Sequence, residues 1–229
     1  MTTQKKKKSA VSTLAAVSMF VIALIIGGGL TGMIFNAYGQ NQSTSSTSST
    51  TTTSTHGTNG GTFKITLVIT VNNAWNATVS GPRYWVLTPN GLESSANINL
   101  PAYTLIQMTI IDYDSASPLP SQFSQVTGTM GNVVYVVNST SAAGDNANLS
   151  TASKVGSLNP NTQIGHTFTV PSIGLNIPIA ANSVEMANFY INQTGTFFWH
   201  CEDPCGFGPS GWLGPMSANG WMGGNITVT

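Results

Sequence analysis

From Thr62 to the end, the sequence consists of short apolar runs separated by clusters of Gly, Pro, Asn and Ser. Apolar and polar residues alternate within these runs, as in half-buried strands, and no run shows a sustained helical period. The expected strands are FKITLVITV, YWVLT, YTLIQMTIIDY, NVVYVVN, HTFTV, VEMANFYI, GTFFWH and GNITVT. About eight strands with turn signals between them predict an all-β fold, a Greek-key β-sandwich. Residues 115–160 are polar and interrupted, which indicates an insertion with one strand or hairpin.

Residues 1–36 carry the lysines Lys5 to Lys8, followed by a mostly apolar stretch without charge. About twenty such residues suffice to cross a bilayer as a helix. The positive-inside rule keeps the lysines in the cytoplasm and directs the C-terminus outward. We therefore expect a single-pass protein of the cell membrane with an extracellular C-terminal domain. A cleaved signal peptide is the alternative, although no clear A-x-A cleavage site follows the apolar run.

Residues 37–61 form the expected linker between the membrane helix and the folded domain of residues 62–229. Ser43 to Thr55 is an unbroken run of serines and threonines, which buries nothing apolar and predicts a disordered stalk. N-x-S/T sequons lie only beyond the apolar stretch, as expected for an exported glycoprotein. These sequons begin at Asn41, Asn76, Asn138, Asn148, Asn192 and Asn225.

Charged residues make up only 6% of the chain. Beyond Ser9 the basic residues are Lys64, Arg83 and Lys154, so the sequence offers no basic patch for nucleic acid. Few carboxylates also means few groups whose protonation would unfold the protein, a composition that suits an acidic exterior.

Two segments near the C-terminus carry the candidate ligands. Residues 165–179, GHTFTVPSIGLNIPI, place His166 in front of an alternating apolar run. Residues 195–206, GTFFWHCEDPCG, place both cysteines of the chain, Cys201 and Cys205, at the end of an aromatic strand. Thiolates and imidazole together select copper among biological metals. These residues predict a buried copper site and, with it, a role in electron transfer.

The order His, VPSxGL, Gly-x-Phe-Phe and C-x-x-x-C-G resembles subunit II of haem-copper terminal oxidases, over residues 165–229. In that family a cupredoxin domain holds the binuclear CuA centre. The resemblance implies a cupredoxin-like sandwich in which His166 is a terminal ligand and Cys201 and Cys205 are bridging thiolates. It also implies that the main-chain carbonyl of Asp203 is a ligand, in the place usually given to a glutamate.

The chain departs from the family pattern after the cysteines. The family continues C-x-x-x-C-x-x-x-H-x-x-M, but Pro209 stands in the histidine position and no histidine follows. The loop is instead longer and rich in glycine and tryptophan. Its methionines, Met216 and Met222, are candidate thioether ligands, and Met222 is favoured because it directly precedes the closing strand. The family has its second histidine three residues before the methionine, and this chain has Asn219 at that distance from Met222. The sequence therefore leaves open whether one or two copper ions bind.

The cysteines have a second interpretation, because two cysteines in an exported domain can also form a disulfide. The remaining histidines are not expected to be ligands. His200 is adjacent to Cys201 on a predicted strand, so its side chain should point to the opposite face, and His56 lies in the linker.

The resemblance implies a non-catalytic oxidase subunit that accepts electrons from a donor protein or quinol at a CuA-like site. Its partners would be the haem-copper subunit I and other respiratory subunits. One alternative is a copper-free structural subunit II of a quinol oxidase with a Cys201–Cys205 disulfide. Another is a free-standing mononuclear carrier, since the membrane helix and Ser/Thr stalk resemble the layout of archaeal sulfocyanins.

Overall fold

The computed structural model describes residues 61–138 and 151–229. The predicted membrane helix, most of the Ser/Thr linker, His56 and the sequons at Asn41 and Asn148 lie outside these residues. Within the described ranges, no helix is both long and apolar enough to cross a membrane.

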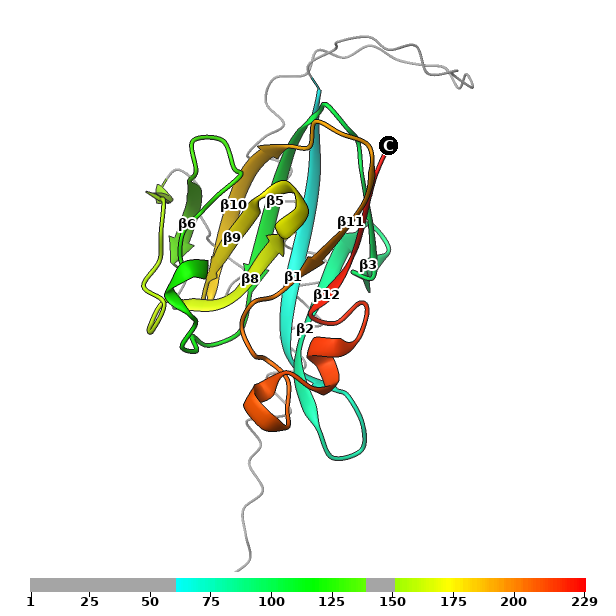
Figure 1. The fold of residues 1–229 in the computed structure, drawn as a ribbon, viewed down its shortest axis with the longest axis vertical. Helices are drawn as coiled ribbons and strands as arrows, with labels where there is room; N and C mark the ends of the chain where they lie inside the picture. The colour runs from blue at the N-terminus through cyan, green and yellow to red at the C-terminus, as the bar shows by residue number, and fades with distance from the viewer. Residues whose placement is uncertain (1–60, 139–150) are drawn as a thin grey trace, which may run out of the picture. The chain divides into compact units, whose positions relative to one another are not determined.

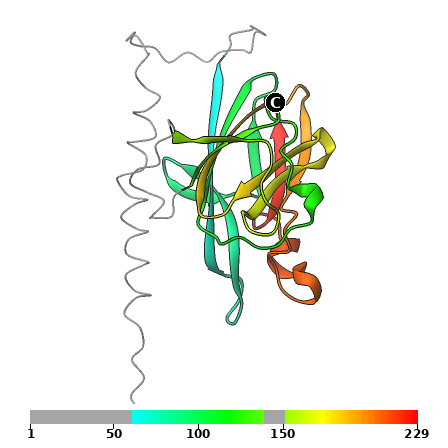
Figure 2. The same ribbon diagram turned by 90° about the vertical axis from the view of Figure 1, so that its left-hand side faces the viewer.

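The described residues form a sandwich of two β-sheets (Figures 1 and 2). The seven-stranded sheet contains, in spatial order, β3 (Gly91–Ser94), β2 (Ser80–Thr88), β1 (Thr62–Ala74), β5 (Leu105–Asp112), β10 (Ser183–Tyr190), β6 (Val134–Asn138) and β7 (Ser153–Val155). The five-stranded sheet contains β4 (Asn97–Leu100), β12 (Gly223–Val228), β11 (Gly195–His200), β8 (Ile164–Val170) and β9 (Leu175–Ala180). Most neighbours are antiparallel, while β1 with β5 and β12 with β4 are parallel.

The predicted all-β sandwich is confirmed, and all eight expected runs form strands. The predicted insertion contains the antiparallel pair β6 and β7. The sequence did not predict β3, β4, β7 and β9 as separate strands. Of these, β9 contains Pro178, and it lies at the edge of its sheet, where a residue without an N–H is tolerated. Helical structure among the described residues is limited to short 3₁₀ turns.

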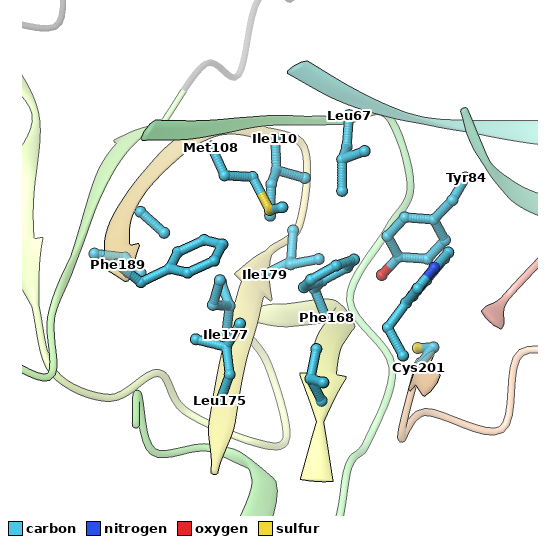
Figure 3. Packing of buried hydrophobic residues seen from close by; sticks show 14 of the residues in the cluster. Leu67, Tyr84, Met108, Ile110, Phe168, Leu175, Ile177, Ile179, Phe189 and Cys201 are labelled. Carbon is cyan, nitrogen blue, oxygen red and sulfur yellow. The ribbon is translucent and has the colours of Figure 1, made fainter. Parts of the chain in front are cut away.

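A single apolar core fills the space between the sheets. Figure 3 shows side chains of one sheet facing Phe168 of β8 and the isoleucines of β9. Each fully buried aliphatic or aromatic side chain contributes about 1.5–3 kcal/mol, so these contacts stabilise the sandwich. Cys201 lies at the edge of this cluster beside Tyr84 of β2 (Figure 3). The core therefore extends directly to the candidate copper ligands.

Candidate metal centre

The structure brings together one imidazole and two thiols. His166 comes from β8, Cys201 directly follows β11, and Cys205 lies in the loop between β11 and β12. One ligand atom of each residue lies within 4.8 Å of those of the other two. His166 Nδ1 is 3.1 Å from Cys205 Sγ and 3.8 Å from Cys201 Sγ. Residues far apart in the sequence thus converge on one small group of soft donors.

A β-bulge sets the position of His166. Ile164 pairs with Ala180 and His166 pairs with Ile179, so Gly165 is one extra residue in β8. Such a bulge re-aims the side chain that follows it. A Cβ atom on Gly165 would lie 2.6 Å from Asp112 Oδ2. A glycine is therefore needed at this position, because the Asp112 carboxyl occupies the space of a side chain.

The second ring nitrogen of His166 is held by a carboxylate. His166 Nε2 lies 3.2 Å from Asp114 Oδ2, and Asp114 follows β5 in a turn in which its N–H donates to Asp112 Oδ1 at 2.8 Å. This contact leaves Nδ1 directed at the cysteines, as in metal sites whose histidine is oriented by a carboxylate. The sequence did not reveal this partner, since Asp114 and His166 are separated by the inserted region.

The three donor residues shift one another's pKa values. Burial alone would lower the pKa of His166, but contacts with Asp114 and Cys201 raise it well above its ordinary value. Burial likewise opposes ionisation of Cys201, yet its contacts with Cys205 and His166 bring the pKa of this thiol well below its usual value. The pKa of Cys205 is raised, first by its contact with Cys201 and then by burial. The group thus favours a thiolate at Cys201 beside a protonated imidazole, whose proton a metal cation would replace.

Backbone N–H groups point at the Cys201 sulfur. The N–H groups of Thr167 and Asp203 each lie 3.4 Å from Cys201 Sγ. Both cysteines are free thiols in this structure, Cys201 buried and Cys205 partly exposed. Hydrogen bonds of this kind stabilise a thiolate or a metal-bound sulfur.

The other two predicted ligands also lie beside the cysteines. Asp203 is buried, its carbonyl accepts the Cys205 N–H at 2.7 Å, and its carboxylate accepts a hydrogen bond from Ser117. The carbonyl of Met222 accepts the Cys201 N–H at 2.8 Å, and the Met222 side chain is fully buried. Their roles as ligands stay predictions.

The long loop between β11 and β12 folds back tightly on itself. A Cβ atom on Gly206 would come within 2.1 Å of the Leu213 carbonyl oxygen and 3.0 Å of Met216 Cγ. Met216 therefore also packs close to the cysteine segment, partly buried against the core. Asn219, which stands where a second histidine was expected, is exposed. Among the described residues, His166 is the histidine that lies in the cluster with Cys201 and Cys205.

His200 is placed as the sequence predicts, on the opposite face from Cys201. Its Nε2 lies 2.6 Å from Glu202 Oε1, and its side chain is 29% exposed. His200 ends β11 and Cys201 follows it, and the two side chains lie on different faces, since Cys201 is only 1% exposed.

Two buried carboxyl groups were not predicted. Asp112 of β5 and Glu185 of β10 are both fully buried, and Asp112 Oδ2 and Glu185 Oε1 have no hydrogen-bond partner. Burial is the main reason that the pKa of Asp112 is raised to about 7 and that of Glu185 to about 8. Asp112 ends β5 after two isoleucines and Glu185 stands between Val184 and Met186 in β10, so an acid beside apolar residues was the available sequence signal.

Comparisons with known proteins match only a short part of the chain. No protein-family profile matches the chain. A segment of 45 residues is 42% identical to cytochrome c oxidase subunit 2 of Culex quinquefasciatus and of Aedes aegypti. The same subunit of Yponomeuta malinellus is 38% identical over 45 residues. Each match covers 20% of this chain and 20% of the relative. The expected resemblance to oxidase subunit II is confirmed over that segment.

Solved structures resemble the chain distantly. The periplasmic domain of subunit II of cytochrome oxidase from Bradyrhizobium japonicum is 12% identical, with 72% of this chain and 83% of that chain covered and a TM-score of 0.31. Auracyanin B is 16% identical, with 73% and 88% covered and a TM-score of 0.29.

Proposed function

We propose that the described sandwich is a copper electron-transfer domain whose site is held by His166, Cys201 and Cys205. The observation that carries the proposal is the convergence of the three donor atoms within 4.8 Å of one another. The donors fit copper, because both cysteines are free and sulfur with imidazole nitrogen is the set that selects this metal. Copper, when bound, would supply one-electron exchange.

The protein contributes a rigid, largely dry setting. His166 and Cys201 are each 1% exposed, so water has little access to two of the three donors. Asp114 fixes the imidazole, and backbone N–H groups fix the Cys201 sulfur. Ligands that cannot move keep the same arrangement in both oxidation states, which is what rapid electron exchange requires. The carbonyl of Asp203 and the thioether of Met222 are proposed as weaker, additional ligands.

The cellular setting proposed here follows the resemblance to oxidase subunit II. The domain would be an outward-facing subunit, anchored in the cell membrane by the helix of residues 1–36, that receives electrons from a donor protein or quinol. It would pass them to a haem-copper subunit I. If so, protease added to intact cells should cut the Ser/Thr linker and release the folded domain, whereas a protected domain would contradict this topology.

Two other functions compete with this proposal. A copper-free structural subunit is favoured by the missing second histidine, and in it Cys201 and Cys205 would form a disulfide. A free-standing mononuclear carrier is favoured by the single histidine of the cluster. The three functions differ in the metal that the protein holds and in the state of its cysteines.

The full-length protein in detergent, loaded with copper, separates these functions. Metal analysis gives the number of ions per chain, and the optical spectrum distinguishes several thiolate bands of a binuclear site from one strong band of a mononuclear site. Replacement of His166 by alanine should abolish the absorption, whereas replacement of the outward-facing His200 should preserve it. A Cys201–Cys205 disulfide in the native protein, found by mass spectrometry together with no copper, would overturn the proposal.

A further inference from the structure

Tyr84 is a buried residue that connects the two sheets at the candidate metal centre. It belongs to β2 of the seven-stranded sheet and is 0% exposed. Its ring centroid lies 5.9 Å from that of His166, and Figure 3 shows the ring beside Cys201. Tyr84 is not among the three clustered donors, yet it contacts segments that carry them.

The side chain of Tyr84 is bonded to the histidine segment. Its hydroxyl donates to the Thr167 carbonyl at 2.8 Å. Thr167 directly follows His166, and its own N–H lies 3.4 Å from Cys201 Sγ. The hydroxyl therefore fixes the carbonyl of the residue that follows His166 and whose N–H points at the Cys201 sulfur.

The backbone of Tyr84 is bonded to the methionine segment. Its N–H donates to the Trp221 carbonyl at 3.0 Å, and Trp221 directly precedes Met222. The Met222 carbonyl in turn accepts the Cys201 N–H at 2.8 Å. On the other side, Ser95 Oγ donates to the Tyr84 carbonyl at 2.9 Å and locks this residue in place.

Arg83 strengthens the same connection. Its Nε donates to the Gly220 carbonyl at 3.0 Å, and its guanidinium lies 3.7 Å from the centroid of the Trp85 ring and 4.9 Å from that of Trp221. Cation–π contacts and a charge-assisted hydrogen bond therefore hold the segment before Met222 against β2.

We propose that Tyr84 is a positioning residue of the metal centre, which holds the His166 segment through its hydroxyl and the Met222 segment through its backbone. This inference rests on the proposed copper function for its effect on the metal. The hydroxyl keeps the Thr167 N–H directed at Cys201 Sγ, and that hydrogen bond withdraws electron density from the sulfur. Such hydrogen bonds stabilise the reduced metal and raise its reduction potential.

The substitution Tyr84→Phe tests the hydroxyl and leaves the ring and the backbone bonds in place. In metal-free protein, the Thr167 carbonyl loses its hydrogen bond, so this segment should open more easily and amide hydrogen exchange at Thr167, followed by NMR, should become about tenfold faster. In copper-loaded protein, the reduction potential should fall and the thiolate-to-copper band should shift.

Two controls separate positioning from a general loss of stability. Tyr190→Phe removes a hydroxyl from a tyrosine that is 46% exposed on β10 and should change neither measurement. Phe189→Leu reduces core packing away from the centre and should lower the melting temperature without moving the potential. If Tyr84→Phe behaved like Phe189→Leu, Tyr84 would be a core residue only and the proposal would be wrong.

The metal-free measurement keeps this inference distinct from the copper proposal. Faster exchange at Thr167 in a protein that binds no copper would support the connection and refute the function. Unchanged exchange would overturn the connection even where copper binds. Should Tyr84→Phe fail to fold, protein containing 3-fluorotyrosine replaces it, because its more acidic hydroxyl strengthens the bond to Thr167. Slower exchange at Thr167 then supports the connection, and unchanged exchange contradicts it.

Discussion

The two sides of the candidate metal centre are built in different ways. His166 comes from β8, a strand that lies between β9 and β11 and whose residues are all buried. Cys205 comes from a loop that contains several glycines and exposes Phe207, Trp212 and Leu213. Sheet pairing and a bulge position the histidine, whereas close backbone contacts within the loop position the cysteine. The strand side therefore depends on the pairing of several strands, whereas the loop side depends on contacts within one segment.

The largest effect on copper binding and stability is expected for Cys201, which lies between the strand side and the loop side. Cys201→Ser should abolish visible absorption of the copper-loaded protein and lower its thermal stability, because the free energy of metal binding adds to that of folding. Cys205→Ser should abolish the absorption with a smaller loss of stability in metal-free protein, since Cys205 is less buried. Spectroscopy and calorimetry of both variants measure these effects. Equal loss of metal-free stability would contradict the distinction between the strand side and the loop side.

Two buried acids of the seven-stranded sheet should make the stability of the sandwich depend on pH. Asp112 and Glu185 have pKa values of about 7 and about 8 in the folded protein, above their ordinary values. Such groups stabilise the fold fully at pH values below their unfolded pKa, and this contribution is lost as the pH rises through 7 and 8. Each pKa unit corresponds to about 1.4 kcal/mol, so the change is on the order of 4–5 kcal/mol for each group.

Urea unfolding of metal-free protein between pH 4 and pH 9 (roughly the range over which these acids ionise) measures this dependence. Glu185→Gln should flatten the decline between the ordinary pKa of a glutamate, about 4.5, and the folded value of about 8, because an amide stays neutral. Glu93→Gln on the exposed surface of β3 is the matched control and should leave the decline unchanged. A wild-type protein that becomes more stable from pH 6 to pH 9 would refute the raised pKa values.

Two glycines test whether the strand side and the loop side of the metal centre differ in their effect on stability. Gly165→Ala places a Cβ 2.6 Å from Asp112 Oδ2, so we expect a loss of unfolding free energy of about 1–3 kcal/mol together with weaker copper binding. Gly206→Ala crowds the Leu213 carbonyl and should weaken copper binding with less effect on unfolding. Gly81→Ala meets Pro215 at an ordinary 3.5 Å and serves as the control. Denaturant unfolding and copper titration distinguish the outcomes.

The smallest effect is expected for the thioethers. Met222→Leu is nearly isosteric, so it should shift the reduction potential or spectrum while the domain stays folded. Met216→Leu should do little, since Met216 is only partly buried and lies in the loop. The opposite result would identify Met216 as the ligand. No change in either variant would show that the site holds no thioether.

The sequence by itself determined the strand content and the donor residues. Alternation of apolar residues predicted eight strands, because the period of a strand is local and can be read from neighbouring residues. The spacing of Cys201 and Cys205 and the lone His166 predicted the cluster that the structure shows. Alternation did not predict β9, which contains Pro178. A proline is compatible with a strand at a sheet edge, and the sequence does not show which strand is the edge.

The tertiary structure alone decided the surroundings of those donors. Asp114 contacts His166 although the inserted region separates them in the sequence, and Tyr84 contacts Thr167 from the opposite sheet. Such contacts depend on which strands become neighbours and on where a bulge turns a side chain, neither of which is encoded by local periodicity. The ligand types were therefore written in the sequence, whereas their orientation and protonation came from residues that only folding brings near.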